Sequence, residues 1–329
     1  MDKTAFKGKR VLITGGLGFI GSNLARRLVA MGAQVALVDS LNPLYGGNRF
    51  NISGIESQVT VEVSDVRDSD RMAHLVRGQD YLFNLAGQTS HMDSMQDPRT
   101  DMEINAEAQL FILEACRRHN PKIRIVFAST RQIYGRPQYL PVDEKHPLAP
   151  VDVNGVNKIA GEGYHLVYHS AYDIPTSVLR LTNTIGPRMR IKDARQTFLG
   201  VWIRLLLEGQ PFEVWGTEPL RDFTFVDDAV EAFLVAATHE RAVGKVFNLG
   251  GERVVSLKEL ADLLIEANGG KGSYRVMEYP ADRKKIDIGD YYADDRLIRR
   301  TLGWAPCVAL PDALRQTLAF YQEHMSRYV

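Results

Sequence analysis

Glycines spaced three residues apart follow a short apolar run near the start of the sequence, and such a turn can bind phosphate. The run 11–13 is typical of a buried parallel strand, and Gly15, Gly18 and Gly21 come directly after it. Helical apolar spacing resumes from Ser22. Residues without Cβ let the backbone approach phosphates, and a helix N-terminus offers free N–H groups with a partial positive charge. The sequence therefore predicts a pyrophosphate site.

An acidic residue lies where a dinucleotide would need one. A second apolar run, 35–38, ends in Asp39, about twenty residues beyond the glycines. A carboxylate there suits the ribose hydroxyls of NAD, whereas NADP would more often require a cation. The alternative, a glycine-rich turn without a ligand, is disfavoured by this order of strand, helix and acid. We therefore expect NAD as the cofactor.

Strand and helix patterns alternate through the first half of the chain, and they position these groups. Strands are predicted at 11–13, 35–38, 59–63, 81–87, 122–128 and 176–181, and helices at 68–77, 98–119 and 154–172. This alternation predicts an α/β fold with a doubly wound parallel sheet, the Rossmann type, whose ligands lie beyond the carboxyl ends of the strands. One crevice should collect the strand ends: Gly15, Asp39, Asp65, Ala86, Gly87, Ser129, Thr130, Thr182 and Asn183.

The regular alternation of predicted strands and helices ends after Gly186-Pro187, where the segments become shorter and mix helix with strand. We expect an NAD-binding domain over 1–185 and a smaller mixed α/β substrate lobe over 186–329. Segments such as 226–250 could return to the first domain, because chains of this build often cross more than once.

Composition bounds the class of protein. Lys plus Arg and Asp plus Glu each number 40 in 329 residues, so nothing suggests nucleic acid or an anionic membrane as partner. No apolar run approaches membrane-spanning length and no signal core is present, which predicts a cytoplasmic protein. Cys116 and Cys307 are too few for a disulfide framework or a metal cluster, so no metal is expected.

Motifs spread over nearly the whole chain resemble the extended short-chain dehydrogenase/reductases that act on nucleotide sugars. They are the turn 14–21, the strand end 84–87, and the segments 129–135, 180–187, 221–228 and 302–306. The resemblance implies an NAD-dependent enzyme of the nucleotide-sugar epimerase/dehydratase type. It implies cofactor contacts from Gly15, Gly18, Phe19, Ile20, Gly21, Asp39, Asn42, Asp65, Val66, Leu85, Ala86, Gly87 and Lys158.

The resemblance also implies a site for a nucleotide-diphosphate sugar. The residues it places there are Gln88, Ser90, Asn183, Gln196, Thr197, Phe198, Arg221 and Arg283. Arginines suit a diphosphate because each can donate bidentate, charge-assisted hydrogen bonds.

One departure concerns the catalytic residues. The family uses a Ser or Thr, which Thr130 matches, and a Tyr with a Lys four residues later on a helix. Lys158 stands in place, but the tyrosine position is occupied by Asn154. Tyrosinate accepts the proton of the sugar hydroxyl in the family, and an amide has no proton that titrates in that range. This chain therefore uses another base, or it does not perform the hydride step in the usual way.

The segment 88–94, read as a loop bordering the sugar pocket, offers replacements. His91 is a candidate because histidine titrates near neutral pH, and Asp93 is either an alternative base or a partner that orients His91. The plainer alternative is a polar surface loop. Arg131 replaces the acid that related dehydratases carry beside their Thr, which counts against dehydration. It could hold a substrate carboxylate or phosphate, lower the pKa of a hydroxyl, or form a structural salt bridge.

We expect an epimerase-type enzyme that transiently oxidises a sugar carbon with tightly bound NAD. Other nucleotide-sugar modifications, decarboxylation or dehydration, are alternatives within enzymes. Because of Asn154, a catalytically impaired protein that binds NAD and nucleotide sugars is the alternative outside them. In the family the helices 98–119 and 154–172 form a dimer interface, which implies a homodimer here.

Overall fold

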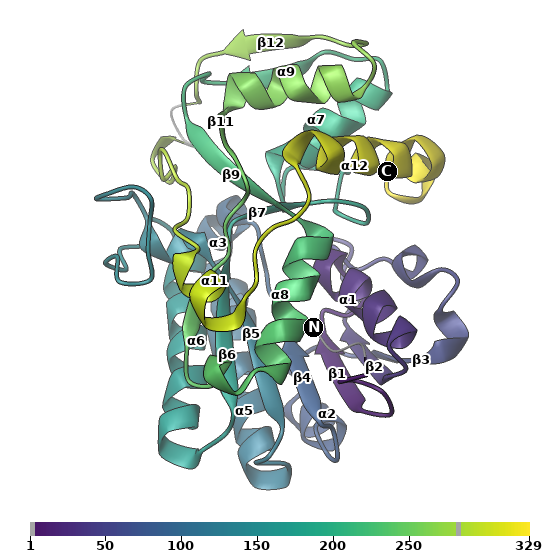
Figure 1. Cartoon of the computed structure of the whole chain (residues 1–329), viewed down its shortest axis with the longest axis vertical. Helices are drawn as coiled ribbons and strands as arrows, with labels where there is room; N and C mark the ends of the chain where they lie inside the picture. Colours follow the sequence, from purple (N-terminus) through teal and green to yellow (C-terminus); the bar gives the residue numbers. More distant parts are fainter. Residues whose placement is uncertain (1–3, 281–283) are drawn as a thin grey trace.

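The computed structural model describes residues 4–280 and 284–329, and a parallel sheet of seven strands forms its larger part (Figure 1). The strand order is β10-β6-β5-β4-β1-β2-β3. The strands are β1 (Arg10–Thr14), β2 (Gln34–Asp39), β3 (Val59–Val63), β4 (Tyr81–Asn84), β5 (Arg124–Thr130), β6 (Thr176–Leu181) and β10 (Val246–Asn248). The order runs outward from β1 in both directions, which confirms the predicted doubly wound α/β fold.

Helices cover both faces of this sheet, so its strands are buried on both sides. Along β1, the side chains of Val11 and Ile13 join the core on one face, and Leu12 joins the core on the other. The first face carries α1 (Phe19–Ala30) and α8 (Val226–Thr238), and the second carries α2 (Ser69–Leu75), α5 (Ala108–His119) and α6 (Val153–Tyr172). This double burial explains the apolar runs of the inner strands, whereas the edge strand β3 alternates and is partly exposed.

A smaller lobe lies above the carboxyl ends of these strands, in the upper part of Figure 1. It contains a three-stranded sheet of β7 (Asn183–Ile185), β9 (Leu220–Phe225) and β11 (Val254–Ser256), and the pair β8 (Phe212–Trp215) and β12 (Tyr274–Met277). Its helices are α7 (Phe198–Leu207), α9 (Leu257–Ala267) and α12 (Leu310–His324). Residues 226–248 return to the large sheet, since α8 packs on α1 and β10 pairs with β6; α11 (Arg296–Leu302) contacts β10.

Two segments differ from the sequence-based prediction. The segment 88–94 is not a loop throughout, because α3 (His91–Gln96) begins there, and the Ser90 hydroxyl caps it by accepting from the Asp93 N–H at 3.1 Å. The helix predicted over 98–119 is divided into α4 (Pro98–Met102), a π-helical turn at 103–107, and α5. Within the described residues, no helix is long and apolar enough to cross a membrane.

Candidate functional site

A crevice lies between the carboxyl ends of the large sheet and the smaller lobe, with a volume of about 650 Å³. Nearly all the residues proposed from the sequence line it. Two do not: Asn42 is absent from the lining and accepts the Leu44 N–H in its own turn at 2.9 Å, and Arg283 lies outside the described residues. The other residues in this crevice come from elements far apart in sequence, as the strand-end rule requires.

The glycine turn leaves no room for side chains. Gly15 has φ +66°, and a Cβ built on Gly21 would lie 2.2 Å from the Gly15 carbonyl oxygen. Helix α1 begins directly after Gly18, which caps it without any side-chain hydrogen bond. The first N–H groups of α1 therefore meet the crevice without a capping side chain, which is the arrangement that binds a pyrophosphate.

Asp39 ends β2 at the edge of the crevice. Its two carboxylate oxygens accept the backbone N–H groups of Leu17 at 3.0 Å and Leu41 at 2.9 Å. Burial raises the pKa of Asp39 although both of these bonds oppose the shift. The remaining acceptor positions of the carboxylate suit two ribose hydroxyls. Further along the crevice, Arg67 holds the Asp65 carboxylate through both of its oxygens.

Lys158 lies beneath the crevice floor on α6. Burial lowers the pKa of its ammonium to about 8. Its Nζ donates to the Ala128 carbonyl at 3.3 Å and lies 5.1 Å from the centre of the Phe127 ring. A Cβ on Gly87 would approach Nζ to 2.9 Å, so the glycine leaves the ammonium open to the crevice. This group fits hydrogen bonds to the nicotinamide ribose.

The Asn154 side chain is buried and hydrogen-bonded to other groups of the protein. Its Nδ2 donates to the Gln88 carbonyl at 2.8 Å and to Asp101 Oδ2 at 3.0 Å, so both amide hydrogens are engaged. Asn157 donates to the other Asp101 oxygen at 2.8 Å. Asn154 therefore ties α6 to the crevice wall, and it neither accepts a proton nor has a free donor for a substrate.

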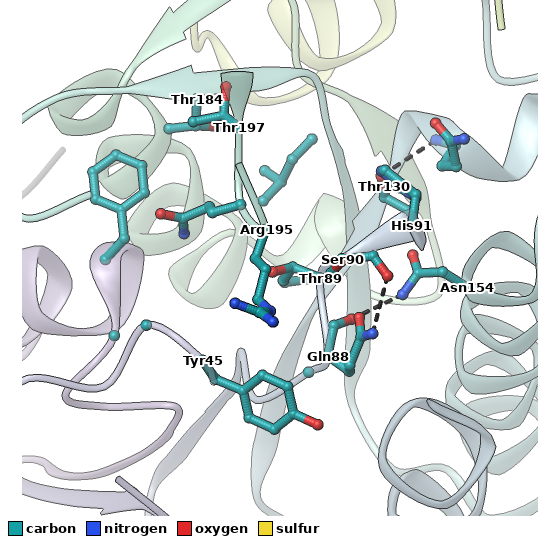
Figure 2. A pocket seen from close by; sticks show the side chains of 18 of the residues that line it. Tyr45, Gln88, Thr89, Ser90, His91, Thr130, Asn154, Thr184, Arg195 and Thr197 are labelled. Atoms are coloured by element: carbon teal, nitrogen blue, oxygen red, sulfur yellow. Dashed lines mark hydrogen bonds between the residues drawn. The ribbon is translucent and has the colours of Figure 1, made fainter. Parts of the chain in front are cut away.

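His91 lies at the crevice surface close to Thr130 and Asn154 (Figure 2). Its Nδ1 is 2.9 Å from Asp152 Oδ2, although the ring is not aligned for a straight hydrogen bond. The imidazole is 38% exposed and the Asp152 carboxylate is fully buried. The buried Asp152 carboxylate thus contacts one side of the His91 imidazole, and the other side of the ring faces the crevice.

The Asp152 carboxylate is fixed independently of His91. It caps α6 by accepting the Gly155 N–H at 2.7 Å, and it accepts Gln132 Nε2 at 2.8 Å. Burial by itself would raise the pKa of Asp152, but the contact with His91 and these two bonds outweigh burial and lower it. The carboxylate is therefore an anion held in one orientation beside the imidazole.

Asp93 does not orient His91. Its Oδ2 accepts Arg195 Nε at 2.8 Å, and Arg195 also pairs with Asp193 at 2.9 Å. Figure 2 shows the Arg195 side chain extending into the crevice. The ion pair joins α3 to the segment before α7, and it directs the Asp93 carboxylate toward Arg195.

Two arginines line the substrate side of the crevice. Arg131 Nη2 donates to Asn183 Oδ1 at 3.0 Å, while its Nη1 is buried without a partner among the described residues. Arg221 donates to the carbonyls of Leu220 and Gly289, and its Nη2 is 3.4 Å from Asp287 Oδ1. Burial lowers the pKa of both guanidinium groups, that of Arg131 to about 10.

The remaining predicted substrate residues line the crevice, but most of their polar atoms are hydrogen-bonded to other groups of the protein. Gln88 Nε2 donates to the Ser90 carbonyl at 2.9 Å, whereas Gln88 Oε1 is buried without a partner among the described residues. Gln196 accepts the Arg190 N–H at 2.7 Å, and Thr197 caps α7. Phe198 begins α7 and packs its ring edge-on against Trp202.

Sequence reasoning missed Asp101, Asp152 and Arg195. Asp152 carried a usable signal, because an aspartate directly before a predicted helix is a common N-cap. Asp101 and Arg195 carried none, since Asp101 meets Asn154, and Arg195 meets Asp93, across more than fifty residues of sequence.

The sequence of residues 11–250 matches the model of the NAD dependent epimerase/dehydratase family. The chain belongs to this family. A dTDP-glucose 4,6-dehydratase of Streptomyces griseus is 32% identical over 96% of the chain and 95% of its own length. A UDP-glucose 4-epimerase of Mycolicibacterium smegmatis is 31% identical, with 95% and 98% covered. Among solved structures, an epimerase of Methanothermobacter thermautotrophicus superposes with a TM-score of 0.92 at 25% identity, covering 99% of this chain and 96% of that one.

The residues that line the crevice agree with membership of this NAD-dependent family of enzymes. The glycine turn, Asp39 and Lys158 fit NAD, which when bound supplies a reversible acceptor for hydride. The resemblance found in the sequence is thereby confirmed at the level of family, fold and cofactor. The family match does not address the residue at position 154.

Proposed function

We propose that the protein is an epimerase-type enzyme that transiently oxidises one carbon of a nucleotide-diphosphate sugar with tightly bound NAD. The observation that carries the proposal is the pair of His91 and Asp152 at the crevice surface beside Thr130. A proton acceptor is thereby present although the usual tyrosine is absent.

His91 has the features required of a general base. Its Nδ1 faces Asp152 at 2.9 Å, which leaves Nε2 as the ring atom that can accept a proton from a sugar hydroxyl. The fixed carboxylate favours the positive charge that the imidazole then acquires. Thr130 Oγ1 accepts the Gln132 N–H at 3.2 Å, so its own hydrogen is free to be donated to the sugar oxygen. When the hydride returns, the proton follows the same route in reverse.

Lys158 would act on the ribose side rather than as the base. Its ammonium lies close to Gly87 and donates to the Ala128 carbonyl. A positive charge there favours binding of the ribose hydroxyls and stabilises negative charge that develops on a nearby sugar oxygen. This role does not require the tyrosine.

Dehydration is less well supported, whereas decarboxylation stays an alternative within enzymes. Dehydratases of the family carry an acid and a base next to the catalytic threonine, whereas this chain has Arg131 and Gln132, and Gln132 donates to Asp152.

The non-enzymatic alternative is a protein that binds NAD and a nucleotide sugar without reaction. Asn154 favours it, because the amide is committed to structural bonds.

A panel of nucleotide sugars incubated with the NAD-loaded protein tests the proposal. Absorbance of NADH at single turnover and the composition of the products should be followed together. We expect transient NADH and an epimerised sugar from at least one member. Binding of the sugar nucleotide without NADH or product from any member would establish the binding-protein alternative instead.

The homodimer is a further proposal, supported by apolar side chains on the exposed side of α6. Val156 and Val167 are 54% and 56% exposed on this helix. Exposed apolar residues of this kind suit a helix-to-helix contact between two copies. Val167→Glu should convert a dimer to monomers in sedimentation, whereas Val276→Glu, at an equally exposed valine on β12, should not. A monomeric wild-type protein would exclude the dimer. The cytoplasmic location likewise remains a prediction from composition.

A further inference from the structure

We propose that Arg131 binds a carboxylate on the sugar part of the substrate, so that the enzyme acts on nucleotide-linked acidic sugars. This inference rests on the proposed function and names the class of its substrate. It starts from a cation in the crevice that forms no ion pair within the described part of the protein.

The guanidinium of Arg131 is held in place by neutral groups. Arg131 follows Thr130 at the end of β5, its Nη2 donates to Asn183 Oδ1 at 3.0 Å, and its Cζ lies 5.3 Å from the centre of the Tyr291 ring. Its Nη1 is buried and has no hydrogen-bond partner among the described residues. The two hydrogens on Nη1 of this fixed, planar cation therefore have no acceptor within the described part of the protein.

The nearby carboxylates are engaged elsewhere. Asp222 accepts the hydroxyl of Thr182 and the N–H groups of Gly251 and Ala293, both at 3.2 Å. Asp287 faces Arg221 and accepts the Tyr279 hydroxyl at 3.2 Å. Within residues 4–280 and 284–329, no ion pair forms with Arg131; the second cation, Arg221, opposes its charge, whereas Asp222 and Asp287 favour it from beyond ion-pair distance. A buried cation without a paired anion is costly, and an anionic ligand would remove that cost.

The backbone position of Arg131 favours an anion on the sugar rather than the diphosphate. Arg131 directly follows Thr130, so its main chain lies at the end of the crevice that holds Thr130 and His91, and its guanidinium reaches from there to Asn183. Arg221 comes from β9 of the smaller lobe and is the arginine expected at the diphosphate. A guanidinium can donate in parallel from two of its nitrogens to the two oxygens of a carboxylate, and Nη2 keeps a second hydrogen beside the one that it donates to Asn183.

Affinity measurements on the NAD-loaded protein test this assignment without requiring turnover. UDP, dTDP, GDP and CDP would first identify the preferred nucleotide by calorimetry. The glucose and glucuronic acid derivatives of that nucleotide then form a matched pair that differs at one carboxylate. We expect the wild-type protein to bind the glucuronic acid derivative at least tenfold more tightly.

Arg131→Gln should reduce this preference to within about twofold, with the affinity for the nucleoside diphosphate unchanged. Arg195→Gln is the matched control, because Arg195 lines the same crevice but is neutralised by Asp93 and Asp193; its preference should remain. Arg131→Met serves the same test if the glutamine variant does not fold, as judged by thermal unfolding.

Three results would overturn the assignment. The first is that the wild-type protein shows no preference for the acidic sugar, and the second is that Arg131→Gln keeps the preference. The third is that Arg131→Gln loses affinity equally for both sugars and for the nucleoside diphosphate, which would place Arg131 at the diphosphate. Failure of the proposed function looks different: the preference for the acidic sugar would persist while no NADH or product formed.

Discussion

Replacing His91 by asparagine removes the proposed proton acceptor while keeping a donor toward Asp152. Asparagine places an N–H group near the position of Nδ1, so the contact at 2.9 Å can be retained. Loss of a general base typically lowers the rate by about two to four orders of magnitude. We therefore expect kcat to fall by at least about a hundredfold, with the affinity for the nucleotide sugar changed by less than about threefold.

Asp152→Asn provides the second measurement, because asparagine also caps helices well and the start of α6 should persist. Opposite charges 2.9 Å apart attract by roughly 1.4 kcal/mol in a water-like medium and by roughly 6 kcal/mol at a dielectric constant of 20. The ring is 38% exposed, so screening favours the lower part of this range, roughly 1–3 kcal/mol. The rate should thus fall about 5- to 150-fold.

Single-turnover formation of NADH, measured at one pH with saturating nucleotide sugar, is the assay for both variants. His119→Asn, an exposed histidine at the end of α5, is the control and should leave the rate unchanged. Turnover of His91→Asn within about threefold of the wild type, at unchanged affinity, would refute the assignment of the base.

Further predictions concern the cofactor site. Asp39→Ala should weaken NAD binding by about 1–3 kcal/mol because ribose hydrogen bonds are lost, and should not weaken NADP binding; titration of both cofactors checks the ratio. Gly21→Ala should abolish NAD binding, since its Cβ would lie 2.2 Å from a carbonyl oxygen, whereas Gly46→Ala, with no atom within 4 Å, should be tolerated. Lys158→Met should inactivate the enzyme yet stabilise the NAD-free protein below pH 8. Burial lowers the pKa of this lysine from 10.5 to about 8, so keeping its charge in the folded protein costs about 3 kcal/mol, which methionine avoids. This gain should shrink between pH 8 and 10.5, where the folded protein holds the lysine neutral and the unfolded chain does not; urea unfolding at pH 7 and pH 10 measures it.

The cofactor half of the site could be predicted from the sequence because each of its signals is local. The glycine turn needs only the spacing of residues 15, 18 and 21, and Asp39 needs only its place after an apolar strand. The parallel sheet then brings the strand ends together by geometry that is general to the fold. No long-range information is required for this part.

The catalytic half depends on pairings that spacing does not encode. The partner of His91 is Asp152, from the start of α6, although Asp93 lies only two residues away in sequence. Asp93 is instead drawn to Arg195, because a guanidinium from the smaller lobe reaches its carboxylate. A sequence shows which groups can titrate, whereas the packing of α3 against α6 decides which of them meet.

The bonds of Asn154 also constrain how this chain can change over evolutionary time. A tyrosine at 154 would lack the amide hydrogens that now satisfy Asp101 and the Gln88 carbonyl. The buried carboxylate would lose a donor, and a larger ring would need space in a wall that is already packed. We therefore expect Asn154→Tyr to lower the stability of the protein unless position 101 changes with it, so the neighbours of Asn154 restrict substitution at this position.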